Sequence, residues 1–148
     1  MTTLVDYRKA RFNYEIMDTY EAGIELSGAE VKSLKKGQGS LDGSHVLIRG
    51  GEAYVVNMLV PAYQEKNIPE GYEPRRNRRL LLTKKEIREL ATKELAKGLT
   101  IVPISIYNKG NLVKVSVAVV RGKKQHDKRA STKDRETARE ARRAMLDR

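Results

Sequence analysis

The chain has 148 residues, of which 30 are Lys or Arg and 19 are Asp or Glu, so its formal net charge is +11. This length suffices for one domain with a buried core. The absence of cysteine excludes a disulfide scaffold, a thiolate zinc site and a cysteine nucleophile. No apolar run approaches the ~20 residues that span a bilayer, and residues 1–6 lack the layout of a secretory signal. We therefore expect a cytoplasmic protein with no membrane partner. The charge predicts a polyanionic partner, with nucleic acid as the first choice.

Strand patterns dominate residues 1–120. Alternating apolar side chains predict a half-buried strand at 12–17. Strands at 44–49 and 52–57 flank Gly50 and Gly51, which have the two-residue spacing of a tight hairpin. A second hairpin is predicted between strands at 99–107 and 112–120. Pro103 removes an amide hydrogen and so indicates an edge or a bulge in the first of these two strands.

Two capping boxes predict helices between these strands. Ser27 with Glu30 begins a helix that runs to Lys36, and Thr83 with Glu86 begins another that closes at Gly98. Five or six short strands with two helices predict a mainly β domain with flanking helices, built on a compact antiparallel barrel such as the OB fold. The residues expected to face the core are Val31 and Leu34 in the first helix and Ile87, Leu90, Ala91 and Leu95 in the second.

Positive charge is concentrated at the C-terminal end of the chain. Residues 121–148 hold 11 Lys or Arg and 5 Asp or Glu, a charge of +6, whereas residues 1–120 carry +5. The C-terminal segment also lacks Val, Ile, Phe, Tyr and Trp. We therefore predict a folded domain at 1–121 and a basic tail at 122–148, which is disordered alone and becomes helical when it binds.

Patterns typical of catalysis or metal binding are scarce. His45 and His126 have no neighbours at metal-ligand spacing, and no nucleophile elbow or phosphate-binding loop occurs. Glu21, Glu25 and Glu30 form a possible carboxylate set, for which structural roles are the better interpretation. The sequence therefore predicts no enzyme, no cofactor and no metal site.

The basic clusters suit contact with phosphates. Residues 7–14 interleave cations with aromatic rings, which favours phosphate contact with stacking on an unpaired base, unless the rings belong to the core. The first helix carries three lysines, and four arginines at 75–79 precede an apolar run; a solvated loop is the alternative for the arginines. The candidate RNA-binding residues in these clusters are Arg8, Lys9, Arg11, Tyr14, Lys32, Lys35, Lys36, Arg76, Arg78 and Arg79.

The tail combines cations with a ring that can stack or take up a proton, that of His126. Behind it, Ser131 and Asp134 can begin a helix whose arginines would meet phosphates. A tail that serves only solubility is the alternative. The candidate cations of the tail are Lys123, Lys124, Lys128, Arg129, Arg135, Arg139, Arg142 and Arg143.

Four blocks of the sequence resemble the SsrA-binding protein (small protein B) family. They are Glu-Ala-Gly at 21–23, Leu-x-Gly-x-Glu-Val-Lys-Ser-Leu at 26–34, Arg-Arg-Leu-Leu-Leu at 78–82 and Gly-Lys-Lys-Gln-His-Asp-Lys-Arg at 122–129. The resemblance runs from about Tyr7 to the C-terminus. Tyr7 itself stands where the family often has Asn, and the segment 61–73 carries no motif of the family.

This resemblance implies a six-stranded, closed OB-type barrel with helices packed around it. It implies a monomeric RNA-binding adaptor that binds the tRNA-like domain of tmRNA and brings it to stalled 70S ribosomes for trans-translation, which rescues the ribosome and tags the peptide. The alanyl-tmRNA arrives with elongation factor Tu and GTP. The resemblance also places Glu21, Gly23 and Leu81 in tmRNA recognition.

For the tail, the resemblance implies entry into the empty mRNA channel near the decoding centre of 16S rRNA, where His126 stacks on a base. The tail residues that it implicates are Gly122, Lys123, Lys124, Asp127, Lys128 and Arg129. A general ribosomal or RNA-binding OB-fold protein is the alternative function, and an RNA-modifying or RNA-cleaving enzyme is the third class.

Overall fold

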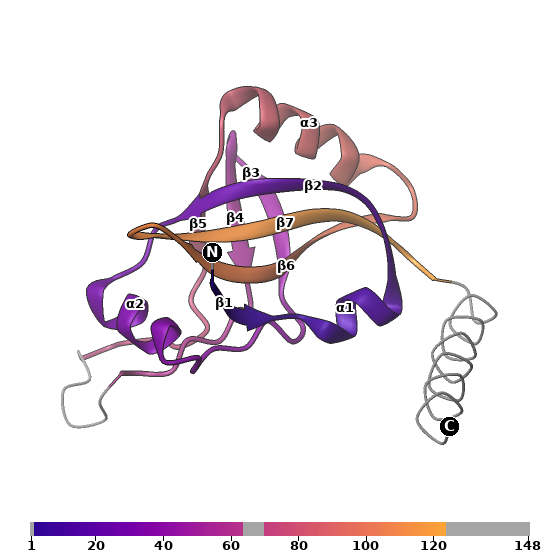
Figure 1. Cartoon of the computed structure of the whole chain (residues 1–148). Coiled ribbons are helices and arrows are strands. Elements are labelled where there is room, and N and C mark those ends of the chain that lie inside the picture. The colour runs from indigo at the N-terminus through magenta and orange to yellow at the C-terminus, as the bar shows by residue number, and fades with distance from the viewer. Residues whose placement is uncertain (1, 64–69, 124–148) are drawn as a thin grey trace, which may run out of the picture.

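The computed structural model describes residues 2–63 and 70–123, which form one antiparallel sheet with three helices around it (Figure 1). The strand order is β1-β6-β7-β2-β5-β4-β3. The strands are β1 (Thr2–Asp6), β2 (Tyr14–Ile24), β3 (His45–Arg49), β4 (Glu52–Val56), β5 (Arg78–Leu81), β6 (Leu99–Lys109) and β7 (Leu112–Gly122). The helices are α1 (Arg8–Asn13), α2 (Gly28–Lys35) and α3 (Lys84–Leu95). In Figure 1, α3 lies above the long strands, and α1 and α2 lie below them.

The core is built on the three longest strands, β2, β6 and β7. β7 pairs with β6 on one side and with β2 on the other. β6 is buried continuously from Ile101 to Tyr107 because β3, α1 and α3 all pack against it. A strand covered on both faces needs apolar residues at successive positions, which explains why its sequence does not alternate.

Both predicted hairpins are confirmed. β3 and β4 pair across Gly50 and Gly51, whose φ angles are 59° and 76°. The β6–β7 hairpin turns at Gly110, with φ at 62°. These are left-handed conformations that glycine adopts without strain. The register of β6 shifts between Pro103 and Ser105, so Pro103 marks a bulge in an interior strand and not an edge.

Both capping boxes are confirmed. The side chain of Ser27 accepts a hydrogen bond from the Glu30 amide at 3.2 Å, and that of Thr83 accepts one from the Glu86 amide at 3.2 Å.

One core assignment is wrong, since Leu95 is 87% exposed, and two are not confirmed, since Val31 and Ala91 are half-buried and lie outside the core. Leu95 is the last residue of α3, and the buried side chains of that helix, Ile87 and Leu90, lie earlier in it.

Two further expectations need correction. The strand predicted at 12–17 begins only at Tyr14, because Phe12 belongs to α1. A register shift between Ile16 and Asp18 interrupts the alternation, and both Ile16 and Met17 are exposed.

The mainly β architecture with flanking helices is confirmed and agrees with an OB-type sheet, but the sheet is not closed. The described residues form seven strands where the resemblance implies six, and β1 and β3 are edges that do not pair with each other. The β3 edge is partly covered by a side chain, since the amide of Ile48 donates to Glu94 Oε2 of α3 at 2.8 Å. This contact protects an edge that could otherwise pair with another chain.

A buried ion pair joins α2 to β5. Glu30 is 1% exposed and Arg78 is 0% exposed, and Arg78 Nε donates to Glu30 Oε2 at 2.7 Å. The same guanidinium donates to the carbonyl oxygens of Met58 at 2.8 Å and Pro74 at 3.0 Å. Burial alone would raise the pKa of Glu30, but the hydrogen bonds from Arg76, the Ser27 amide and Arg78 together hold it below its ordinary value. The carboxylate is therefore ionised and saturated with donors.

We expect Glu30→Gln to lower the free energy of unfolding at pH 7 by about 3 kcal/mol, because a buried guanidinium then lacks its counter-charge. Since folding lowers the pKa of Glu30, its stabilisation is complete above the ordinary value of 4.5 and is lost as the pH falls through the folded-state value. Urea unfolding between pH 7 and pH 3 measures both effects.

Wild-type protein should lose more stability than Glu30→Gln over the acid part of that range. The exposed Glu15 on β2 supplies the control, because Glu15→Gln should change stability by less than about 0.5 kcal/mol. Equal stability of Glu30→Gln and wild type at pH 7 would contradict the role of this pair.

Candidate nucleic-acid interface

Three of the sequence blocks meet at one place in the fold. The end of β2 pairs with β5, with Gly23 opposite Leu81, and the amide of Glu25 donates to the Arg79 carbonyl oxygen at 3.0 Å. A Cβ atom at Gly23 would lie 3.2 Å from the Leu81 Cβ atom, so glycine permits this close approach. The third block joins them through the ion pair of Glu30 with Arg78. Segments far apart in the sequence thus form a single structural unit.

Glu21 is held at the surface beside this unit. It lies on β2, where it accepts hydrogen bonds from Tyr107 Oη at 2.6 Å and from Lys109 Nζ at 3.0 Å. The hydrogen bond from Tyr107, and then that from Lys109, lowers the pKa of Glu21. Burial, followed by the Glu21 carboxylate, raises the pKa of Tyr107 to about 12. Glu21 is therefore an oriented anion with lone pairs still open to solvent.

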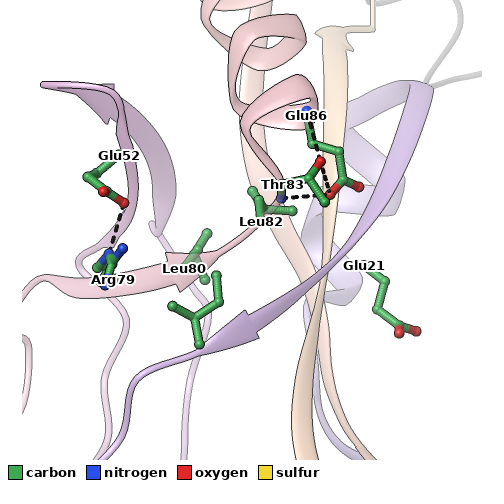
Figure 2. Close-up of a pocket in the computed structure, with 8 residues that line it drawn as sticks. Glu21, Glu52, Arg79, Leu80, Leu82, Thr83 and Glu86 are labelled. Atoms are coloured by element: carbon green, nitrogen blue, oxygen red, sulfur yellow. Dashed lines mark hydrogen bonds and ion pairs between the residues drawn. The ribbon is translucent and has the colours of Figure 1, made fainter.

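A pocket of about 410 Å³ lies between Glu21, β5 and the start of α3. Figure 2 shows Arg79 paired with Glu52 on one side of it and Thr83 with Glu86 on the other, while Glu21 points away from both pairs. The Arg79–Glu52 contact is 2.8 Å long. The residues that line the pocket are Glu21, Glu52, Arg79, Leu80, Leu81, Leu82, Thr83 and Glu86. The pocket thus combines carboxylate acceptors with an apolar surface that includes Leu81, which is 46% exposed.

The prediction that Arg78 contacts RNA is wrong. Its side chain has no exposed surface, and all its donors serve the fold. Neither Arg78 nor Arg79 is in a solvated loop, since both belong to β5. The side chain of Arg76 is 38% exposed but binds Glu30 at 2.5 Å, and that of Arg79 is 41% exposed and bridges Glu52 and Glu25. Arg76 and Arg79 therefore remain candidates that are already partly neutralised.

The cations of residues 7–14 lie on a short helix. Arg8, Lys9 and Arg11 are exposed on α1; Lys9 lies 3.8 Å from Asp42, and Arg11 lies 3.2 Å from Asp6. The two tyrosine rings of this segment belong to the core or pack against it. Tyr7 is buried and its hydroxyl accepts a hydrogen bond from the Gly43 amide at 3.2 Å, and Tyr14 is half-buried against the core. α1 therefore offers charge for phosphates, and its flanking tyrosines mainly support the fold.

Two sets of residues escaped the sequence analysis. Tyr63 lies in the segment without a motif, yet its ring contacts two lysines of α2. On α3, the cations Lys84, Lys85 and Arg88 are exposed. They were missed because carboxylates alternate with them in the sequence, although those carboxylates are engaged by other groups. The contacts are those of Glu86 with Thr83, of Glu89 with Tyr20, and of Glu94 with Ile48 and Arg49.

The tail begins where β7 ends. Gly122 pairs with Tyr14, and the amide of Lys123 donates to the Asn13 carbonyl oxygen at 2.9 Å. The other predicted tail contacts lie outside the described residues: Lys124, His126, Asp127, Lys128, Arg129, Arg135, Arg139, Arg142 and Arg143. Across residues 2–63 and 70–123, no group of acidic or histidine side chains is arranged to hold a metal ion. Within the same ranges, no helix has the length and apolar character to cross a membrane.

We expect Glu21→Gln to lower the pKa of Tyr107 from about 12 part of the way toward 10, because the negative charge that disfavours the phenolate is removed while burial and a neutral acceptor stay. The measurement is the phenolate absorbance during alkaline titration, with Tyr107→Phe identifying the contribution of Tyr107. Superimposable titrations of wild type and Glu21→Gln would show that this contact is absent in solution.

Comparisons with known proteins agree over nearly the whole chain. Residues 4–147 match the family described as SmpB protein. The SsrA-binding protein of Gloeothece citriformis (strain PCC 7424) is 47% identical over 142 residues, which cover 96% of this chain and 92% of that protein. The SsrA-binding protein of Chelativorans sp. (strain BNC1) is 45% identical over 149 residues, which cover 100% of this chain and 96% of the relative.

The fold comparison points the same way. A chain of the solved structure described as "tmRNA-SmpB: a journey to the center of the bacterial ribosome" has a TM-score of 0.68 and 45% identity to this protein. The match covers 81% of this chain and 84% of that chain. From the family match, the near full-length relatives and this shared fold, we conclude that the chain belongs to the SmpB protein family.

Proposed function

We propose that this protein binds the tRNA-like domain of tmRNA and delivers tmRNA to stalled ribosomes for trans-translation. The observation that carries the proposal is the match to the SmpB family over residues 4–147. The fold adds a physical reason, because three of the sequence blocks of the resemblance converge on one surface beside Glu21. The protein acts as an adaptor, and recognition of this kind needs no reacting side chain.

The body of the protein is suited to recognising the shape of a folded RNA. Side chains cannot read the deep major groove of an A-form helix, so contacts go to phosphates, to 2′-hydroxyls and to bases that are not paired. The ionised Glu21 accepts hydrogen bonds and repels phosphates, which suits base amino groups and 2′-hydroxyls. Leu81 offers an apolar contact beside it, and the exposed cations of α1 and α2 supply phosphate contacts.

We assign recognition of the stalled ribosome to the tail, residues 122–148. A basic segment that orders only on binding can enter a channel walled by RNA. If mRNA already fills the channel, the tail and the message compete for the same positions and binding is lost. In this way the tail senses an empty mRNA channel near the decoding centre.

The remaining parts of the proposal concern assembly. The protein acts in the cytoplasm, where its RNA partners are, and binds as a monomer. Elongation factor Tu with GTP joins through alanyl-tmRNA. The supporting observation is again membership of the SmpB family.

RNA sequencing after a pulldown of the full chain from bacterial lysate tests the proposal directly. We expect strong enrichment of tmRNA over tRNA and ribosomal RNA. Recovery of bulk tRNA and ribosomal RNA without enrichment of tmRNA would favour a general RNA-binding protein and contradict the proposal.

Removal of residues 122–148 should leave tmRNA affinity within about tenfold, or ~1.4 kcal/mol, of the full chain while it abolishes peptide tagging. The reason is that the core lies entirely in earlier residues among those described. Gel-shift titration measures affinity, and tagging in a reconstituted translation system measures rescue. A greater loss of tmRNA affinity would contradict this division.

Glu21→Ala should weaken tmRNA binding about tenfold without unfolding the protein, because a charge-assisted hydrogen bond to RNA is lost. Glu15→Ala is the matched control on the same strand, where the exposed carboxylate has no hydrogen bond or ion pair to the described residues. Thermal unfolding checks that both variants remain folded. If the two variants bind tmRNA equally well, Glu21 has no role in recognition.

A further inference from the structure

Helix α2 presents positive charge that its own carboxylate does not neutralise. Lys32, Lys35 and Lys36 are exposed at its C-terminal end. The carboxylate of the helix, Glu30, is buried and forms ion pairs with Arg76 and Arg78. Among the described residues, these lysines form no ion pair. Clustered, unneutralised ammonium groups repel one another, and an anionic ligand would relieve that repulsion.

Two of these lysines share one aromatic ring. Lys36 Nζ lies 4.7 Å from the centre of the Tyr63 ring, and Lys32 Nζ lies 5.8 Å from it. Lys32 and Lys36 are four positions apart on α2 and therefore extend from the same face of the helix. Cation–π contacts at exposed sites are weak, so long lysine side chains can leave the ring when a better partner arrives.

The position of Tyr63 does not depend on these lysines. The buried hydroxyl of Ser33, in the middle of α2, donates to the Pro61 carbonyl oxygen at 2.8 Å. One residue earlier, the Val60 carbonyl oxygen accepts a hydrogen bond from Tyr72 Oη at 2.6 Å. The backbone two and three residues before Tyr63 is thus anchored to α2 and to Tyr72, and the Tyr63 ring is half-buried.

We propose that Lys32, Lys36 and Tyr63 form a binding site for an unpaired RNA nucleotide, whose base stacks on Tyr63 while its phosphate binds the two ammonium groups. In the free protein, the ammonium groups cover the ring. In the complex, the base takes the ring face and the lysines turn to the phosphate. The inference rests on the proposed RNA-binding function and adds Tyr63, from the segment 61–73, as a stacking residue.

A nucleotide fits this arrangement better than an acidic peptide does. Every base has a π-face, and stacking on an aromatic side chain is stronger than an exposed cation–π contact. A carboxylate could bind the lysines but would leave the ring without a stacking partner. The site should therefore tolerate different bases and require that the nucleotide be unpaired.

The test uses the full chain and a ten-nucleotide single-stranded RNA that contains one 2-aminopurine, a base whose fluorescence is quenched by stacking. Wild type and Tyr63→Phe should bind it equally and quench it. Tyr63→Ala should lose about tenfold in affinity together with the quenching. The double variant Lys32→Gln with Lys36→Gln should reduce the slope of log affinity against log salt by about 0.7, because one phosphate contact is lost.

The matched control removes two exposed cations to which no contact is assigned, as Lys97→Gln with Arg121→Gln. It should leave both the quenching and the ratio between wild type and Tyr63→Ala unchanged. The proposal is overturned if wild type fails to quench the probe, if Tyr63→Ala binds as wild type does, or if the control variant loses the quenching. An acidic peptide that competes with the probe equally well in wild type and Tyr63→Ala would also overturn it.

A parallel titration with tmRNA identifies the source of the nucleotide. A tenfold loss for Tyr63→Ala on tmRNA assigns the nucleotide to tmRNA, whereas a loss confined to the probe assigns it to another RNA. Both results uphold the site. This measurement is independent of the pulldown, so a protein that enriches tmRNA but shows no stacking on Tyr63 keeps the proposed function and loses only this inference.

Discussion

The buried ion pair between Glu30 and Arg78 is the interaction on which the rest of this structure depends. Two buried charges are costly unless each meets its partner and further donors or acceptors. Here Glu30 also caps its own helix through Ser27, and Arg78 also binds the Met58 and Pro74 carbonyl oxygens. α2, β5 and the chain between β4 and β5 are thereby held in one arrangement. Removal of either partner would leave an uncompensated buried charge, which is why neither residue can change alone.

The candidate RNA-binding features are grouped around this pair. β5 carries Leu81 to the end of β2, beside the Glu21 carboxylate that Tyr107 and Lys109 orient. On the other side, α2 turns its lysines outward and anchors the segment that leads to Tyr63. The surface around Glu21 and Leu81 and the surface formed by the α2 lysines and Tyr63 are therefore positioned by the same buried ion pair. A folded RNA with both helical and unpaired parts matches such a rigid arrangement better than a flexible strand does.

Local signals in the sequence predicted much of this fold. The capping boxes at Ser27 and Thr83 and the glycine turn at Gly50 and Gly51 depend on neighbouring residues, and all were confirmed. Two of the failures concern partners that are remote in the sequence. From the local sequence, Arg78 resembles an exposed cation, because its buried partner Glu30 lies 48 positions away. The contact of Glu21 with Tyr107 spans 86 positions and was likewise not predictable from neighbouring residues. The helix α1 was missed because it has six residues and no side-chain cap.

We propose that RNA recognition depends on the surface around Glu21 and Leu81, which contacts tmRNA. Photo-crosslinking from a benzophenone amino acid tests it most directly, with the probe placed at Leu81 in one variant and at Leu95 in another. Both leucines are exposed, at 46% and 87%, but Leu95 lies at the far end of α3 from the pocket. We expect crosslinks to tmRNA from position 81 and none from position 95. Absence of crosslinks from position 81, or equal crosslinking from both positions, would contradict the proposal.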